Sequence, residues 1–394
     1  MKKIVLIHPI PTHYRLPLFN ELAKRLKENN THLRIFFCRL KSLIRKNWRI
    51  NMKEANFAYR ELNNLSIYFG RRVFDIPYSL LVILFQENPQ LIICTGFSIS
   101  SIVAYVYCKL KKIPYIIWSG AYNYIHKKTV DYNRHTNPIR RKVRSLLVRQ
   151  SAACIAYSSV TKDYFCELIG IDSQKIFIAM NTVDTRFFVK TSKELRTKIS
   201  EIKRKYSLAR NNIVYVGDIR KRKGVYYLLE SIIELRKKLS DFCLHMVGDG
   251  HERKKLEDFC IKHNIDKNVY FWGYKPQDEV AHIYTISDFF IFPTLVDPWG
   301  LVLSEAMASG LPVIASKYAG ATHDLVQNGV NGFVIDPENI KEMAQKILIL
   351  LKNEKLRKKM GENAKKTIQE RFTIEKSAQG FIDAIEYALN QKSM

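Results

Sequence analysis

The sequence predicts an α/β protein with two Rossmann-like, doubly wound parallel-sheet domains that face each other across a cleft. Its 394 residues exceed what one hydrophobic core usually organises, so two domains are expected. Short runs rich in β-branched and aromatic residues alternate with helix-like segments, which is the rhythm of βαβ units. Several runs, such as LIIC and YIIW, are apolar throughout, as expected for parallel strands covered on both faces.

The predicted strands form two series with a polar stretch between them. The first series covers residues 3–7, 33–38, 91–94, 115–118, 154–157 and 176–179. The second series covers residues 213–216, 242–247, 269–272, 289–292, 312–315 and 332–335. We therefore expect an N-terminal domain over 1–184, an interdomain connection over 185–211, a second domain over 212–370, and a C-terminal helix over 371–394 that packs back toward the N-terminal domain.

Several classes of protein are disfavoured by simple patterns. The most apolar stretch, residues 78–85, is far shorter than the roughly 18 residues that a membrane span needs. The apolar run at the start is interrupted by His8 and Pro9, so we expect a buried first strand and no signal peptide. The seven cysteines never occur as CxxC, and the ten histidines form no HxxxH or HExxH pattern. We expect a cytoplasmic protein with reduced cysteines and no bound metal.

The charge is strongly positive and unevenly distributed. The formal net charge is +27, and residues 1–190 carry 31 Lys/Arg against 11 Asp/Glu, a net +20. Such a field attracts anionic partners, whether nucleic acid, an acidic membrane surface or a phosphorylated substrate. A lysine-rich composition without specific attraction explains the charge equally well. No nucleic-acid-binding module is recognisable, so we expect no nucleic acid as a partner.

One loop of the second domain has the composition of a phosphate site. The strand at 213–216 ends at Gly217, and four cations, Arg220 to Lys223, precede the helix that Gly224 begins. A turn glycine, several cations and a helix N-terminus together can hold phosphate oxygens. By itself the signal is weak, because a basic run is usually a solvated surface.

A second loop gives a stronger signal. After the strand at 289–292, Gly300 lets the backbone approach a ligand, and the amides of Gly300, Leu301 and Val302 begin a helix that ends at Gly310. Glu305, one turn along, can accept hydrogen bonds from a vicinal diol such as a ribose. Asp297 lies eight positions earlier. Glu305 could instead cap its own first turn and Asp297 could be a turn residue, but two phosphate-type loops on neighbouring strands favour ligand binding.

These motifs resemble a known family. DPWGLVLSEAMASGLPVIAS, followed by YAGATHDLVQNGVNGFVI, looks like the donor-site signature of glycosyltransferase family 4, retaining enzymes of the GT-B fold. The likeness extends through YVGDIRKRKG, MVGDG, VYFWGY and NTVDTRFF, and it covers residues 181–335. Members transfer a sugar from a nucleotide donor with retention and without a divalent metal, and relatives of this kind build bacterial or archaeal surface polysaccharides. The resemblance therefore implies a nucleotide-sugar co-substrate and no cofactor.

The resemblance also implies roles for individual residues. Lys223 would hold the donor diphosphate, Glu305 the ribose, and Asp297 would contact the transferred sugar, which makes these three the catalytic candidates. The full donor-binding set is Gly217, Arg220, Lys223, Gly248, Trp272, Gly300, Leu301, Val302 and Glu305. Two positions depart from the family pattern. Asp297 replaces the first glutamate of the E-x7-E motif, and Asp218 stands where relatives often have arginine. We expect Asp218 to turn away and Arg220 to substitute.

The first domain offers fewer signals. HPIPTHYRLPLF resembles the opening of a subgroup of the same family, and it places His13, Tyr14 and Arg15 where an acceptor would enter. An equally good reading is that these residues only start the helix at 16–26. Many relatives have a histidine near the end of the strand written here YIIWSGAY, but this chain has Trp118 to Gly120 there, with His126 further on. No catalytic histidine is identified.

The expected function is transfer of a sugar from a nucleotide donor to a glycan or lipid-linked glycan, without a metal. The basic segment 126–150 predicts peripheral association with an anionic membrane on the cytoplasmic side, although such runs are more often solvated. Its candidate residues are Lys127, Lys128, Arg140, Arg141, Lys142 and Arg144. The alternatives are an inactive nucleotide-sugar-binding protein, a nucleotide-sugar epimerase and a nucleic-acid-binding protein.

Overall fold

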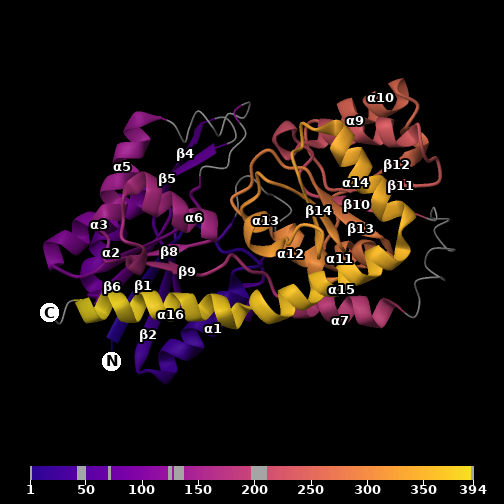
Figure 1. The fold of residues 1–394 in the computed structure, drawn as a ribbon. Helices are drawn as coiled ribbons and strands as arrows, with labels where there is room; N and C mark the ends of the chain where they lie inside the picture. Colours follow the sequence, from indigo (N-terminus) through magenta and orange to yellow (C-terminus); the bar gives the residue numbers. More distant parts are fainter. Residues whose placement is uncertain are drawn as a thin grey trace. The chain divides into compact units, whose positions relative to one another are not determined.

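The computed structural model describes residues 2–41, 50–69, 72–122, 127, 137–196 and 211–391. These residues form two compact units. The first unit contains the described residues up to 122, residues 137–183 and residues 374–391, and the second contains residue 127 and the described residues of 184–373. Each unit is a parallel sheet with helices on both faces (Figure 1).

The first unit is built on a seven-stranded parallel sheet with the order β3-β2-β1-β6-β7-β8-β9. Its strands are β1 (Lys2–His8), β2 (Thr31–Phe37), β3 (Ala58–Glu61), β6 (Leu91–Thr95), β7 (Tyr115–Ser119), β8 (Ala153–Ala156) and β9 (Ile176–Ile178). A separate antiparallel hairpin joins β4 (Leu65–Phe69) to β5 (Arg72–Ile76). The strand order reverses between β1 and β6, which makes their carboxyl ends the topological switch point of this unit.

Alternate side chains of β1 enter two different cores, one on each face of the sheet. Ile4 and Leu6 pack with α1 (Leu16–Glu28) and α16 (Ile374–Asn390). Val5 and Ile7 pack with α2 (Leu80–Glu87), α3 (Ile99–Lys111) and α5 (Pro138–Arg149). The short helix α6 (Ser159–Asp163) follows β8. The final helix α16, yellow in Figure 1, therefore belongs to the N-terminal unit although it is last in the sequence.

The second unit has a six-stranded parallel sheet with the order β12-β11-β10-β13-β14-β15. Its strands are β10 (Asn212–Val216), β11 (Cys243–Val247), β12 (Val269–Gly273), β13 (Phe289–Phe292), β14 (Val313–Ser316) and β15 (Gly332–Ile335). Its helices are α7 (Thr185–Arg196), α9 (Val225–Arg236), α10 (Arg253–Lys262), α11 (Gln277–Ile286), α12 (Leu301–Ala308), α13 (Gly320–Leu325), α14 (Ile340–Lys352) and α15 (Glu354–Arg371). The order reverses between β10 and β13.

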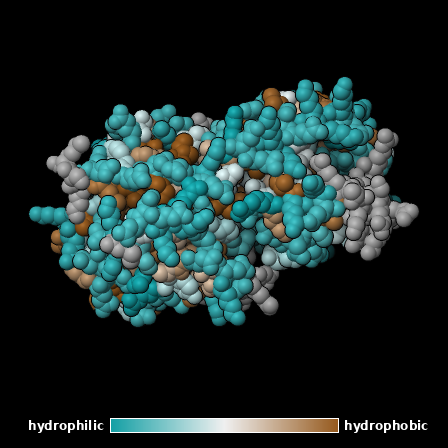
Figure 2. Space-filling model, turned by 90° about the horizontal axis from the view of Figure 1, so that it is seen from below, coloured by the Kyte–Doolittle hydropathy of each residue, from teal (hydrophilic) through white to brown (hydrophobic). Residues whose placement is uncertain are grey.

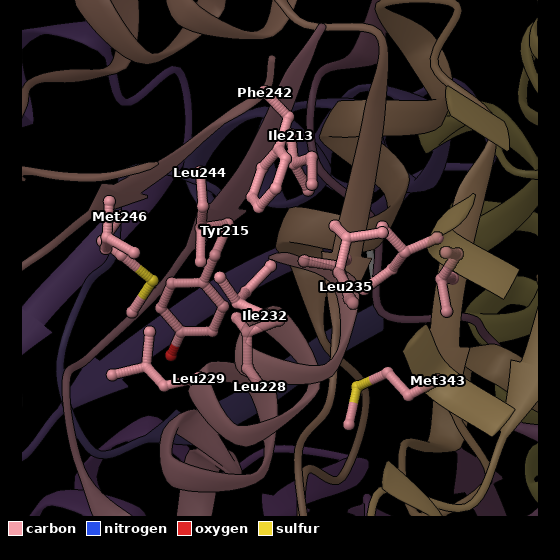
Figure 3. Packing of buried hydrophobic residues seen from close by; sticks show 14 of the residues in the cluster. Ile213, Tyr215, Leu228, Leu229, Ile232, Leu235, Phe242, Leu244, Met246 and Met343 are labelled. Atoms are coloured by element: carbon pink, nitrogen blue, oxygen red, sulfur yellow. The ribbon is translucent and has the colours of Figure 1, made fainter. Parts of the chain in front are cut away.

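The main core of the second unit lies between the first strands of the sheet and α9. Figure 3 shows Ile213 and Tyr215 of β10 facing the leucines and isoleucine of α9, with Met343 of α14 closing the cluster. Tyr215 is fully buried, and its hydroxyl donates a hydrogen bond to the carbonyl of Asp218 at 2.9 Å. The buried phenol therefore also fixes the loop that follows β10.

The predicted fold class is confirmed, since both units are parallel sheets of the Rossmann type. Every predicted strand is present. The strands β3, β4 and β5 were not predicted, because their residues are mostly exposed and form no continuous apolar run. The facing arrangement and the cleft stay predictions.

The stretch expected to connect the domains begins with a helix. Residues 185–196 form α7, which packs on α11 and α12 inside the second unit. Phe188 is fully buried and anchors it. This helix was not predicted, because the segment is mostly polar. Its few buried side chains recur at helical spacing and form no strand-like pattern. Residues 197–210 lie outside the described residues.

Candidate functional site

Two loops meet at the switch point of the second unit. One follows β10 and the other follows β13, and these strands are neighbours in the sheet although they are far apart in the sequence. In open α/β sheets, ligands bind outside the carboxyl ends of the strands where the order reverses. The topology therefore places both sequence-derived phosphate loops at the position where a ligand is expected.

The loop after β10 is fitted tightly against the loop after β13. A short 3₁₀ helix, Lys221–Lys223, is followed by Gly224 with φ +70°, and α9 begins at Val225. A Cβ atom on Gly224 would lie 1.8 Å from the carbonyl oxygen of Pro293, so no larger residue fits without displacing that loop. The backbone also joins the loops, because the amide of Leu295 donates to the carbonyl of Arg222 at 2.9 Å.

Lys223 and Asp297 form a direct ion pair between the two loops. Lys223 Nζ lies 2.5 Å from Asp297 Oδ2, and the side chains are only 10% and 17% exposed. Asp297 Oδ1 also accepts a hydrogen bond from the Trp299 amide at 3.1 Å. Burial on its own would raise the pKa of Asp297, but Lys223, the Trp299 amide and Arg222 outweigh it and hold the pKa below its ordinary value. Lys223 is thus a buried, positioned cation and no part of a solvated basic run.

The remaining cations of this loop have different partners. Arg222 Nη1 donates to the carbonyl of Val296 at 3.2 Å and so ties the loops together. Arg220 Nε lies 3.7 Å from Asp218 Oδ2, and both side chains are about one third exposed. Opposite charges two residues apart attract each other across the turn. The expectation that Asp218 turns away from the donor and that Arg220 substitutes for it stays a prediction.

The helix α12 begins with free amide groups. Gly300 precedes it with φ +98°, and a Cβ there would lie 2.5 Å from the Phe292 ring. Within the described chain, the amides of Gly300, Leu301 and Val302 donate to no other group. The first amides of a helix lack intrahelical acceptors and carry the positive end of the helix dipole, so they can bind anionic oxygens.

Glu305 projects from the second turn of the same helix. The Tyr284 hydroxyl of α11 donates to Glu305 Oε2 at 3.4 Å and lies 3.3 Å from the Val302 carbonyl. Burial raises the pKa of Glu305 to about 7, and the Tyr284 hydrogen bond lowers it only in part. Because the carboxyl meets Tyr284 and not the amides of its own first turn, Glu305 is no N-terminal cap.

Gly217 and Gly248 lie together, whereas Trp272 is turned elsewhere. The Gly217 amide donates to the carbonyl of Val247 at 2.9 Å, and the Gly248 amide donates to that of Gly273 at 2.8 Å. The Trp272 indole Nε1 donates to Nδ1 of His245 at 3.2 Å, and His245 Nε2 is 3.0 Å from Asn212 Oδ1 at the start of β10. The indole therefore reaches back along the sheet, and it does not join the other donor-site candidates at the strand ends.

At the switch point of the first unit, the three acceptor-side candidates differ in exposure. His13 is exposed, Tyr14 is half-buried, and Arg15 is only 2% exposed at the residue before α1. Sequence reasoning missed His8, which ends β1 and is 7% exposed. Burial and the nearby charge of Arg15 lower its pKa to about 3, so the ring is neutral at physiological pH. The position of His8 at the end of the first predicted strand was the sequence feature that could have identified it.

The described residues contain no group of three side chains that could hold a metal ion, and no helix in them is long and apolar enough to cross a membrane. Independence from metal stays a prediction. His126 and Lys128 lie outside the described residues.

Two family models match the chain over separate ranges. The model described as Glycosyltransferase Family 4 matches residues 18–187, and the model described as Glycosyl transferases group 1 matches residues 198–367. Two parallel-sheet units of the Rossmann type are the architecture of GT-B glycosyltransferases. The chain belongs to glycosyltransferase family 4, which confirms the resemblance seen in its motifs.

Similar proteins include enzymes with different substrates. The chain is 24% identical over 273 residues to alpha-D-kanosaminyltransferase of Streptomyces kanamyceticus, an alignment that covers 69% of this chain and 70% of that one. It is 28% identical over 198 residues to N-acetyl-alpha-D-glucosaminyl L-malate synthase of Bacillus anthracis, covering 50% and 49%. The Anabaena protein HepE, solved with UDP, has the same fold with a TM-score of 0.76, 18% identity and coverage of 98% and 100%.

Proposed function

We propose that this glycosyltransferase moves a sugar from a nucleotide-sugar donor to a hydroxyl of a glycan or lipid-linked glycan in surface polysaccharide biosynthesis. The observation that carries the proposal is the arrangement at the switch point of the second unit. There, a buried lysine and the free amides of a helix N-terminus stand on adjacent loops. Cations and amides of this kind suit a diphosphate, and they need no metal ion to bind it.

In the proposed complex the donor diphosphate draws Lys223 away from Asp297. Its oxygens accept hydrogen bonds from Lys223 and from the amides of Gly300 and Leu301, which already point away from other partners. As the bond to the sugar breaks, negative charge grows on the diphosphate, and these preorganised groups stabilise it. Arg220 adds a weaker contribution, since it is shared with Asp218 and partly exposed.

Glu305 is proposed to bind the ribose. Two ribose hydroxyls can donate to one carboxylate, and such hydrogen bonds favour its ionised form. The raised pKa of about 7 belongs to the carboxyl without a ligand. Nucleotide binding is therefore expected to lower the pKa of Glu305.

Retention of configuration is part of the proposal. The acceptor hydroxyl would attack the anomeric carbon on the face that the diphosphate leaves, and the departing diphosphate oxygen would take the hydroxyl proton as the bond between sugar and phosphate breaks. One displacement of this kind keeps the configuration. Asp297 would orient the sugar through its carboxylate and form no bond to it. Without a donor the low pKa of Asp297 keeps that carboxylate ionised, and the Trp299 amide and Arg222 still favour the ionised form when Lys223 turns to the diphosphate.

The acceptor is proposed to be reached at a membrane surface, where one face of the first unit combines apolar and basic side chains. Ile139 and Leu146 of α5 are 72% and 50% exposed, next to Arg140, Arg141 and Lys142. Helices α2 and α3 add seven further exposed apolar residues, which are Leu81, Val82, Phe85, Ile99, Ile102, Val106 and Leu110. Figure 2 shows hydrophobic side chains gathered on the side of the N-terminal unit. Apolar insertion with flanking cations suits an anionic leaflet.

The test of donor binding is a panel of UDP-, GDP- and ADP-sugars followed by thermal shift. HepE was solved with UDP, so UDP-sugars are tested first. A ligand at 100 times its Kd adds about 2.7 kcal/mol of stability. Lys223→Ala should weaken binding by about 1.5–3 kcal/mol, the worth of a charged hydrogen bond. The matched control is Lys237→Ala, which removes an exposed lysine that pairs with Glu234 at the far end of α9.

Two outcomes would contradict the proposal. Equal binding of every nucleotide to wild type and Lys223→Ala would show that the donor site lies elsewhere. Binding without transfer or hydrolysis of any donor would favour an inactive nucleotide-sugar-binding protein. Product analysis by NMR distinguishes retention from inversion once a donor is known.

A further inference from the structure

We propose that the first unit holds a site for an oxyanion, a phosphate or carboxylate carried by the acceptor, and that Arg15 is its centre. The site lies at the switch point between β1 and β6, on the loop that follows β1. That the ligand belongs to the acceptor rests on the proposed function. That an oxyanion binds there rests on the side chains themselves.

Arg15 is a buried cation without a counter-charge. The residue is 2% exposed, yet its Nε and Nη1 atoms have no hydrogen-bond partner. Among the described residues, no carboxylate forms an ion pair with it. Burying an unpaired charge is costly, and most buried polar groups in folded proteins are satisfied. The Nε and Nη1 groups of Arg15 therefore call for an acceptor that the described residues do not supply.

Aromatic rings surround the guanidinium, and the Tyr157 hydroxyl forms a hydrogen bond with it, whereas Nε and Nη1 stay without a partner. Its carbon atom lies 4.2 Å from the ring centre of Trp118, 5.1 Å from that of Tyr157 and 5.5 Å from that of Tyr14. Such rings attract the cation through their faces, but they do not accept its in-plane N–H groups. A phosphate or carboxylate accepts these N–H groups in pairs.

Further unpaired polar groups lie beside Arg15. The Trp118 indole Nε1 and the Thr12 hydroxyl are buried without partners, and the Arg15 amide donates to the Thr12 carbonyl at 2.9 Å. The nearby His8 ring already uses Nδ1 for the carbonyl of Ile10 at 2.8 Å. The first turn of α1 contains no acidic residue. The surroundings are rich in donors and poor in negative charge, which suits an oxyanion.

Intrinsic fluorescence offers a direct test, because Trp118 is part of the site. Wild type and variants are titrated with glucose 1-phosphate, glucuronate and glucose, which differ in their charged group. We expect a saturable change with glucose 1-phosphate, glucuronate or both, and none with glucose. The titrations are repeated in Lys223→Ala, so that phosphate bound at the donor loops does not contribute. Trp118→Phe should abolish the signal, which separates it from the other three tryptophans.

Arg15→Gln should weaken the response at least tenfold, whereas Arg60→Gln, which removes an exposed arginine of β3 in the same unit, should leave it unchanged. Saturation with the phosphate ester alone assigns a phosphorylated acceptor, and saturation with glucuronate alone assigns an acidic sugar. No saturation with either anion overturns the proposal. So does an unchanged affinity in Arg15→Gln that is folded by circular dichroism.

Two measurements keep the test independent of other failures. If Arg15→Gln does not fold, calorimetric titration of the wild type with the same three ligands decides the outcome, since equal heats for glucose and both anions would refute the site. UDP-sugar binding, followed by thermal shift, should be unaffected in Arg15→Gln. If no nucleotide binds but an anion still saturates the Trp118 signal, the donor assignment fails and the oxyanion site stands.

Discussion

In the unliganded protein, the charged side chains of the two proposed donor loops are already held in place by contacts with each other. Lys223 is not free but paired with Asp297, 74 positions later, so the site satisfies its own charges until a ligand arrives. Breaking one half of a buried pair leaves the other unpaired, which is far more costly than losing an exposed pair. In the proposed complex, donor binding therefore requires Lys223 to exchange Asp297 for the diphosphate.

Glu305→Gln should stabilise the protein above pH 7. Glu305 titrates near 4.5 in the unfolded chain and near 7 in the folded one. Between these pH values the folded protein keeps a proton that the unfolded chain has lost, so stability falls as the pH rises. At about 1.36 kcal/mol for each pKa unit, the ionised carboxylate costs roughly 3 kcal/mol above pH 7. Thermal melting should show a higher Tm for the variant at pH 8 and no difference at pH 4.5.

The same substitution should remove a pH dependence of donor binding. Because ribose hydroxyls favour the ionised carboxylate, wild type should bind a UDP-sugar more tightly at pH 8 than at pH 6. Glutamine does not titrate, so Glu305→Gln should bind weakly and equally at both values. A wild-type affinity that is independent of pH, or an identical slope in the variant, would show that Glu305 does not meet the ribose.

At the scale of elements, each of the two proposed donor loops connects the end of a strand to the beginning of a helix. The helices α9 and α12 both start directly after a glycine with positive φ, at the carboxyl ends of neighbouring strands. The glycines allow the backbone to turn sharply and let one loop rest on the other. A buried core of apolar side chains from β10, β11 and α9 holds in place the strands and the helix that border these loops.

Gly224→Ala tests this packing against a matched control. Gly224 and Gly329 both have positive φ, +70° and +81°, but only Gly224 has another residue's atoms in the way of a Cβ. Positive φ alone costs alanine on the order of 1–2 kcal/mol. Gly329→Ala should lose about that much in urea denaturation, and Gly224→Ala should lose more and also bind donor poorly. Equal losses would mean that the Pro293 loop gives way freely.

At the scale of the whole molecule, charge is concentrated in one part of the chain. Residues 1–190 carry a net +20 of the total +27. The exposed apolar residues of α2, α3 and α5 belong to the same part. Each cation near an anionic leaflet contributes about 1 kcal/mol, so a few side chains suffice for reversible attachment.

Liposome co-sedimentation should show binding to anionic vesicles that weakens steeply with salt. The Debye length falls from about 10 Å at 0.1 M to about 3 Å at 1 M, which screens the attraction. Arg140→Gln combined with Arg141→Gln should reduce binding several-fold. Lys254→Gln combined with Lys358→Gln removes two exposed lysines of the second unit and should not. Equal sedimentation with neutral and anionic vesicles would refute attachment through charge.

Transfer activity should survive EDTA. The proposed phosphate partners are a lysine, an arginine and backbone amides, and these groups do not bind divalent cations. The assay compares initial rates with EDTA, with added Mg²⁺ and with added Mn²⁺. Loss of activity that either metal restores would show that a metal takes part in donor binding.

Local patterns in the sequence determined most of the fold. Apolar runs located every strand whose residues are buried, because burial on both faces leaves a continuous signal. The same patterns pointed to the two loops that are proposed to bind the donor, since a glycine and a cation cluster or helix start after a strand are local features. The exposed strands and the polar helix α7 were not predicted, because their stability comes from contacts with neighbouring elements and not from their own composition.

Only the tertiary structure decided how the site residues are used. The order of strands brings Lys223 to Asp297, Tyr284 to Glu305 and His245 to Trp272, and these pairs are 74, 21 and 27 positions apart. It also surrounds Arg15 with rings from the ends of β7 and β8. Charge and burial of a side chain depend on such partners, which no local pattern encodes. The sequence thus predicted which residues meet at the switch points, and packing determined what each one contacts.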